Sequence, residues 1–87
     1  MDIKSKVLEI ILGEFEEEYV LSLYDNYDIN MIDVFQDLGY DSIKFITIVV
    51  EMESYFHIEL PDEYLSADDF GKIGVIIKAI EELVEGN

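Results

Sequence analysis

The chain has 87 residues, and its 21 Asp and Glu residues against 5 Lys and no Arg give a formal net charge of -16. Because so acidic a chain repels nucleic-acid phosphates and anionic lipid headgroups, we expect neither as a partner. The charge instead favours a partner protein with a basic docking surface, and the hydrophobic content of 51% indicates a folded domain rather than a disordered chain.

The first predicted element is a helix between Ile3 and Phe15. Apolar residues recur there at spacings of four, three, one and four, which places them on one helical face, and they are Ile3, Val7, Ile10, Ile11 and Phe15. Charged residues occupy positions between them, as on a helix with its other face in solvent.

Residues 18–40 are predicted to form a long loop, because the segment 24–30 is rich in Asn and Asp, which favour turns. Apolar residues within this loop are expected to hold it against the core, and they are Leu21, Leu23, Ile29, Ile32, Val34, Phe35 and Leu38. A loop of this length in a small domain is usually either functional or wrongly assigned, so a helical turn within it stays open as an alternative.

Two signals conflict between Ser42 and Phe56. Residues 46–50 are all β-branched, which favours a strand. However, residues at spacings of four, three and four form one helical face, and they are Phe45, Val49, Met52 and Phe56. Asp41 or Ser42 can cap a helix that begins here, and the segment is long for a strand. We therefore predict a helix.

Two further helices complete the predicted fold. Pro61, followed by Asp62 and Glu63, indicates a short helix that ends near Ser66. The last helix carries an apolar stripe ahead of Gly86, formed by Ile73, Ile76, Ile77, Ile80, Leu83 and Val84. Residues 1–87 are thus predicted to form a single all-α domain. It is a small four-helix bundle, with three long helices, one short helix and a long loop between helices 1 and 2, and we expect a monomer.

The composition also bears on where the protein works. The chain has no Cys, so nothing points to disulfides or to an oxidising compartment. Its longest apolar stretch, residues 45–50, is too short to span a bilayer, and no apolar leader follows the N-terminus. We expect a cytoplasmic protein.

The segment 37–43, Asp-Leu-Gly-Tyr-Asp-Ser-Ile, carries the clearest functional signal. Gly39 allows a tight turn, and Asp41 and Ser42 follow at the predicted start of a helix. A phosphate attached to the Ser42 hydroxyl would lie near the positive helix end and its unpaired backbone N–H groups. The alternative is that Ser42 is simply the N-cap of the helix.

The order and spacing of this segment and its surroundings resemble the acyl and peptidyl carrier proteins. The resemblance extends over nearly the whole chain, from the amphipathic first helix through the Asp-Ser helix start and the Pro-Asp-Glu short helix to the Ile-rich last helix. It implies that Ser42 is the attachment site of a covalent 4'-phosphopantetheine, derived from coenzyme A. It also implies that Asp41 is the acidic residue before this serine and Gly39 the turn glycine. Such a carrier is not an enzyme, because the cofactor thiol holds the cargo as a thioester.

The resemblance further implies a docking surface on the helix that follows Ser42. The residues expected to meet partner enzymes are Ile43, Lys44, Thr47, Val50 and Glu51. The expected partners are a phosphopantetheinyl transferase, an adenylation-type loading enzyme and downstream transferring enzymes, each with a basic docking surface.

The cargo stays open between acyl and aminoacyl groups. Ser-Ile-Lys at 42–44 looks like the peptidyl carriers, whereas residues 58–63 look like the acyl carriers. We expect a discrete carrier of a thiotemplate pathway, of the nonribosomal peptide or polyketide type. A medium acyl chain finds room near Phe45, Val49 and Met52 only if Phe45 does not itself fill the space.

Two other functions were compared with the carrier. In the first, the chain is a small acidic helical adaptor for a basic protein partner, and Ser42 is only a helix cap. In the second, a hydrolase, Ser42 needs a base, but the single imidazole is that of His57. It lies about 20 Å from Ser42 along the predicted helix at 1.5 Å per residue.

A metal site is not indicated either. The acidic residues 16–18 have no His or Cys near them in the sequence, as a transition-metal site would need. The sequence therefore favours the carrier.

Overall fold

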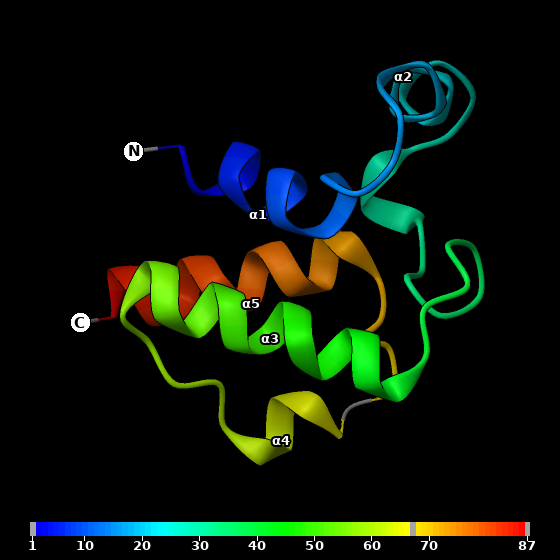
Figure 1. Cartoon of the computed structure of the whole chain (residues 1–87). Helices are drawn as coiled ribbons and strands as arrows, with labels where there is room; N and C mark the ends of the chain where they lie inside the picture. The colour runs from blue at the N-terminus through cyan, green and yellow to red at the C-terminus, as the bar shows by residue number, and fades with distance from the viewer. Residues whose placement is uncertain (1, 67, 87) are drawn as a thin grey trace.

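The computed structural model describes residues 2–66 and 68–86, and all regular elements in these ranges are helical (Figure 1). The elements are α1 (Ile3–Leu12), α2 (Glu17–Asn26), a 3-10 turn η1 (Ile29–Met31), α3 (Ser42–Phe56), α4 (Asp62–Leu65) and α5 (Ile73–Glu85). The predicted all-α class is confirmed.

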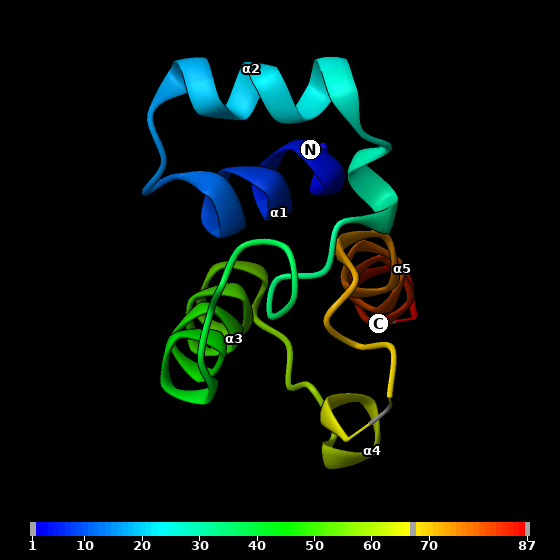
Figure 2. The ribbon, with the colours of Figure 1, turned by 90° about the vertical axis from the view of Figure 1, so that its right-hand side faces the viewer.

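The helices form layers around one core. Figure 2 shows α3 and α5 side by side, with α1 packed over them and α4 on the opposite side, while α2 forms an outer layer beyond α1. Side chains at 1% exposure or less come from α1, α3, α5 and the segment before α3, and they are Val7, Ile11, Val34, Met52, Ile73, Ile76 and Ile80. Within the described residues no polar or charged side chain is buried.

The prediction of a helix from Ser42 to Phe56 is confirmed. One face of α3 is buried and consists of Phe45, Ile48, Val49, Met52 and Phe56. Burial of each such side chain stabilises the fold by about 1.5–3 kcal/mol, whereas the whole β-propensity scale spans only about 1 kcal/mol. Burial of this face therefore outweighs the β-branched composition of residues 46–50.

The prediction that residues 18–40 form one long loop is wrong, because α2 occupies Glu17–Asn26. Two Glu residues in the first turn of α2 favour a helix start. Asn26, which suggested a turn, donates from its side-chain amide to the Ser22 carbonyl at 2.8 Å within the helix. The fold consequently has four helices of ten residues or more, in addition to α4, in the part of the chain that the structure describes.

The remaining segment between α2 and α3 is held to the core by its backbone. The Val34 amide donates to the Gly71 carbonyl at 2.8 Å, and the Ile73 amide donates to the Ile32 carbonyl at 2.9 Å. Of the apolar residues expected to hold this region, four are buried, namely Leu23, Ile29, Ile32 and Val34. Leu21 and Phe35 are instead 53% and 40% exposed.

The other helix boundaries fall close to the predicted ones. The first helix ends at Leu12, with Gly13 as its C-cap, rather than at Phe15. The short helix α4 begins after Pro61 and has Ser66 as its C-cap, and α5 ends at Glu85 with Gly86 as its C-cap, as predicted. In the part of the chain that the structure describes, each helix is too short or too polar to span a lipid bilayer.

Candidate functional site

Asp41, rather than Ser42, caps the N-terminus of α3. The Asp41 carboxylate accepts a hydrogen bond from the Lys44 backbone N–H at 2.8 Å. Ser42 is the first residue of the helix, and its side chain is exposed. Its hydroxyl makes no hydrogen bond with any other described residue. The alternative in which Ser42 is merely the N-cap is therefore wrong, and its hydroxyl is free to react.

Gly39 provides the turn that leads into α3. Its φ angle is +74°, a left-handed conformation that other residues rarely adopt. A Cβ atom at this position would meet nothing within 4 Å, so the requirement for glycine here comes from the backbone angle and not from crowding. The glycine turn expected from the sequence is present three residues before Ser42.

Tyr40 fixes this turn to the rest of the domain. Its backbone N–H donates to the Val34 carbonyl at 2.9 Å, and its ring stacks on Phe15 with centroids 5.9 Å apart. Burial, and then the nearby Glu14 carboxylate, raises the pKa of Tyr40 to about 12. Nothing in the local sequence selects Tyr40, because its side-chain contacts lie on α1 and on the segment after it, far from Tyr40 in the chain.

Two charges lie beside Ser42, namely the partial positive charge of the helix terminus and the negative charge of the Asp41 carboxylate that caps it. The first backbone N–H groups of a helix are unpaired and carry a partial positive charge that favours phosphate. Lys44, two residues on, is turned about 200° around the helix from Ser42 at 3.6 residues per turn. Its ammonium pairs with Glu14 and lies over the Tyr40 ring. A phosphate on Ser42 thus fits the helix end, while Lys44 joins α3 to the segment that follows α1.

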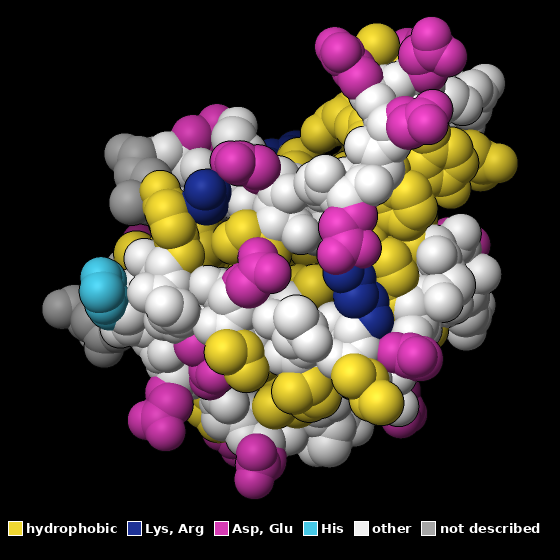
Figure 3. Space-filling model, in the orientation of Figure 1, with side chains coloured by type: hydrophobic (Ala, Val, Ile, Leu, Met, Phe, Trp, Pro, Cys, Tyr) yellow, Lys and Arg dark blue, Asp and Glu magenta, His cyan; other side chains and the backbone are white. Residues whose placement is uncertain are grey.

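The outer face of α3 carries a row of exposed apolar side chains. Ile43, Ile46 and Val50 are 78%, 51% and 55% exposed, and Figure 3 shows hydrophobic side chains along this helix with acidic side chains near them. Thr47 and Glu51 are also exposed. Sequence reasoning missed Ile46, although its spacing of three and four from Ile43 and Val50 places it on the same face. Of the expected docking residues, Lys44 alone is half-buried and ion-paired.

The space behind α3 is filled by aromatic rings. The Phe45 ring lies 4.9 Å from Phe35 and 6.0 Å from Phe70, and Tyr64 continues the row 6.3 Å from Phe70. Phe45 itself is only 6% exposed. These rings occupy the place where the sequence left room for a medium acyl chain.

No hydrolytic pair forms around Ser42. His57 is the C-cap of α3, at the far end of the 15-residue helix that Ser42 begins. Within the described residues, no group of three or more His, Cys, Asp or Glu side chains is arranged to hold a metal ion. The site therefore offers an exposed hydroxyl at a positive helix end, which suits a covalently attached phosphate group.

Comparison with known proteins identifies the family. Residues 21–80 match the family described as "Phosphopantetheine attachment site". The chain is 36% identical to the D-alanyl carrier protein of Streptococcus mutans over 95% of this chain and 96% of the relative. It is 32% identical to those of Streptococcus thermophilus and Streptococcus sanguinis over the same shares. No solved structure gives a significant match.

The matched segment contains Gly39, Asp41 and Ser42, the three residues that the sequence analysis associated with the cofactor. Carrier proteins of this kind are generally not catalysts themselves, and they interact with a phosphopantetheinyl transferase and with loading enzymes. The resemblance to carrier proteins is thus confirmed. The chain belongs to the phosphopantetheine-binding carrier proteins, whose covalently attached prosthetic group is 4'-phosphopantetheine.

Proposed function

We propose that this chain is an aminoacyl carrier in which 4'-phosphopantetheine is attached to Ser42. The cofactor thiol holds a small aminoacyl group as a thioester and presents it to partner enzymes. D-alanine is the first candidate for the cargo. The observation that supports attachment at Ser42 is its exposed hydroxyl at the start of α3. Because Asp41 is the N-cap of this helix, the Ser42 hydroxyl is not needed for capping.

The attachment is a transfer of the phosphopantetheinyl group from coenzyme A. The bond between this group and the 3',5'-ADP portion breaks, a bond from phosphorus to the Ser42 oxygen forms, and the hydroxyl proton leaves. The carrier contributes an accessible hydroxyl and a helix terminus that favours the product phosphodiester. Asp41 keeps the first turn of α3 intact, and Gly39 makes the turn that brings the chain to it.

A small cargo suits the interior of this domain. Because Phe35, Phe45 and Phe70 pack together behind α3, a long acyl chain has to displace aromatic rings to enter. An aminoacyl group needs no such cavity, and its ammonium is compatible with a chain of net charge -16. The D-alanyl carrier names of the relatives support the same class of cargo.

The outer face of α3 is the proposed docking surface for the transferase and for an adenylation-type loading enzyme. It consists of Ile43, Thr47, Val50 and Glu51, to which Ile46 is added here. Lys44 lies at the edge of this surface, where its ammonium is paired with Glu14. An exposed apolar row in an acidic surround suits brief contact with basic enzymes, since charge steers the encounter and a small apolar patch releases quickly.

A second candidate is a carrier in a thiotemplate pathway of the nonribosomal peptide or polyketide type. The Ser-Ile-Lys sequence at 42–44, which looks like that of peptidyl carriers, favours it. The two candidates share the attachment chemistry and differ in the loading enzyme and cargo. They are therefore separated by loading assays rather than by the attachment itself.

The attachment is tested by intact mass. The purified chain is incubated with coenzyme A, Mg²⁺ and a promiscuous phosphopantetheinyl transferase, and we expect one phosphopantetheine adduct, absent in Ser42→Ala. Ser54→Ala, which removes an exposed serine farther along α3, is the matched control and should be modified normally. An adduct that persists in Ser42→Ala would place the attachment elsewhere.

The cargo is tested on the holo-protein. The holo-protein is incubated with a D-alanine-activating ligase and ATP. In parallel reactions it is incubated with amino-acid-adenylating and acyl-loading enzymes of thiotemplate pathways. We expect the D-alanine-activating ligase to load the holo-protein with the highest kcat/KM of these enzymes. The D-alanyl group should be released by hydroxylamine, as expected for a thioester. Preferential loading with a long acyl group would contradict the aminoacyl assignment while leaving the attachment site intact.

A further inference from the structure

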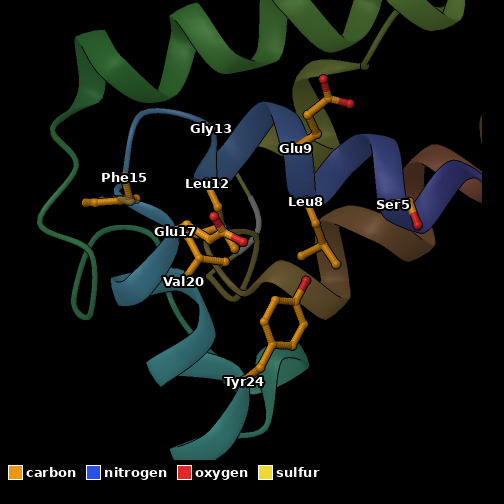
Figure 4. A pocket seen from close by; sticks show the side chains of 9 residues that line it. All are labelled: Ser5, Leu8, Glu9, Leu12, Gly13, Phe15, Glu17, Val20 and Tyr24. Atoms are coloured by element: carbon orange, nitrogen blue, oxygen red, sulfur yellow. The ribbon is translucent and has the colours of Figure 1, made fainter.

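A second apolar surface lies between α1 and α2. Of the residues that line it, only Phe15, which stacks on Tyr40, also takes part in the attachment site described above. This surface is a pocket of about 450 Å³. Leu8 and Leu12 of α1 are buried at its floor, and Val20 of α2 is half-buried beside them. Figure 4 shows the Tyr24 ring extending from α2 toward Leu8, so that the two helices form opposite walls. The pocket opens to solvent and presents mainly apolar side chains.

The helix that forms one wall is weakly anchored. Of the ten residues of α2, Leu23 is the one that is buried. Tyr24, which lines the pocket, is 47% exposed, and Leu21 of the same helix, which does not line it, is 53% exposed. An exposed aromatic side chain at an open, mainly apolar hollow is typical of a protein-binding surface rather than of a bare monomer surface.

The charge at this pocket selects the kind of partner. Glu17 lines it, and its side chain lies next to Val20 and Leu12 in Figure 4, whereas Glu9 points away. Glu16 and Glu18 flank Glu17, and none of the three belongs to either ion pair formed within the described residues. A second copy of a chain with net charge -16 would be repelled. The complementary surface is therefore basic.

We propose that the groove between α1 and α2 docks a basic amphipathic helix of a partner protein. A bulky apolar side chain of that helix enters between Leu8, Leu12 and Tyr24, and a neighbouring Lys or Arg pairs with Glu17. A pocket of about 450 Å³ takes a few side chains of a helix rather than a whole domain.

The lining of this pocket shares no residue with the docking face of α3. All but one of the residues that line the pocket precede residue 21, where the family match begins, and the exception is Tyr24. The groove thus lies outside most of the shared attachment segment. It supplies a contact by which a partner distinguishes this carrier, whereas the face of α3 serves the attachment and loading enzymes.

A peptide titration tests the proposal on the full-length, ¹⁵N-labelled holo-protein. The probe is a synthetic, end-capped helical peptide with Leu on one face and Lys on the other. Two control peptides replace Leu by Ser or Lys by Glu. We expect the probe to shift the amide resonances of Leu8, Leu12, Val20 and Tyr24, and neither control to do so. No shift at millimolar probe, or shifts centred on α3, would overturn the proposal.

Two pairs of matched variants sharpen the test. Glu17→Lys and Glu18→Lys change the same charge in the same first turn of α2, but only Glu17 lines the pocket. Likewise Tyr24 lines it, and the exposed Tyr27 does not. We expect Glu17→Lys and Tyr24→Ala each to weaken probe binding about fivefold or more, and Glu18→Lys and Tyr27→Ala to weaken it less than about twofold. Equal losses within both pairs would overturn the assignment to this groove.

Discussion

The Tyr40 hydroxyl donates a hydrogen bond of 2.6 Å to the backbone carbonyl of Ile11, 29 positions earlier in the chain. This bond joins the end of α1 to the turn that precedes Ser42, and the stacked ring of Phe15 lies beside it. Beyond it, Lys44 of α3 pairs with Glu14. The attachment serine therefore lies between two contacts, one from Tyr40 to α1 and one from Lys44 to the segment that follows α1.

Replacement of Tyr40 by Phe tests this link. The change leaves the Ile11 carbonyl without its partner, so we expect Tyr40→Phe to lower the free energy of unfolding by about 1 kcal/mol in urea titrations at neutral pH. Tyr27→Phe, which alters a ring that is 63% exposed, is the control and should change stability little. An unaltered stability in Tyr40→Phe would show that the bond contributes nothing net.

The same residue predicts an alkaline dependence. Folded Tyr40 ionises at a pKa of about 12 and the unfolded residue near 10.0, so its stabilising contribution is complete below pH 10 and is lost as the pH rises towards 12. We expect wild-type stability to fall more steeply over this window than that of Tyr40→Phe. Urea titrations at several pH values measure the difference, and parallel curves for the two proteins would contradict it.

Substitution of Gly39 separates backbone conformation from packing. Gly39→Ala forces a Cβ residue into a left-handed conformation at a cost of about 1–2 kcal/mol, although the added atom meets nothing within 4 Å. Asn tolerates this conformation better than Ala, so Gly39→Asn is the matched control and should be the more stable variant. Thermal unfolding of both proteins measures the order, and a reversed order would contradict the conformational explanation.

The cap of α3 gives a prediction about the helix on which Ser42 stands. Asp41→Ala removes the acceptor for the Lys44 backbone N–H, and we expect a loss of about 1 kcal/mol in the free energy of unfolding. Asp41→Asn keeps an acceptor at the same place, so its free energy of unfolding should fall by only about a few tenths of a kcal/mol. If Asn and Ala destabilise equally, the carboxylate charge rather than the cap is responsible.

These residues show what the sequence can and cannot predict. The helix from Ser42 to Phe56 was predictable because its buried face repeats at helical spacing. The helix α2 was not, because it buries only Leu23 and its Asn26 favours turns in isolation. The bond from Tyr40 to Ile11 has no local signature at all, since it depends on how two distant segments pack. Ile46 lies within a β-branched run, but its spacing of three and four residues from Ile43 and Val50 is a signal in the sequence that could have selected it.

The docking face of α3 is tested by truncating its apolar row. We expect Ile46→Ala and Val50→Ala each to lower the kcat/KM of phosphopantetheinyl transfer about fivefold, which corresponds to about 1 kcal/mol of lost transition-state contact. Leu21→Ala is the matched control, because Leu21 on α2 is 53% exposed and Ile46 is 51% exposed. Equal rates for all three variants would show that the transferase contacts another surface.

The packed rings behind α3 predict where the cargo rests. Because Phe45 is wedged between Phe35 and Phe70, we expect the methyl resonances of Val49, Met52 and Ile76 to be the same in the holo-protein and in its D-alanyl and octanoyl thioesters. Phe45→Leu removes aromatic volume at this place and opens a cavity at a cost of about 1–3 kcal/mol. In that variant the octanoyl chain should enter and shift these methyl resonances, while the D-alanyl group should leave them unmoved. Large shifts in the wild-type octanoyl protein would mean that the rings part readily and that the interior does not select a small cargo.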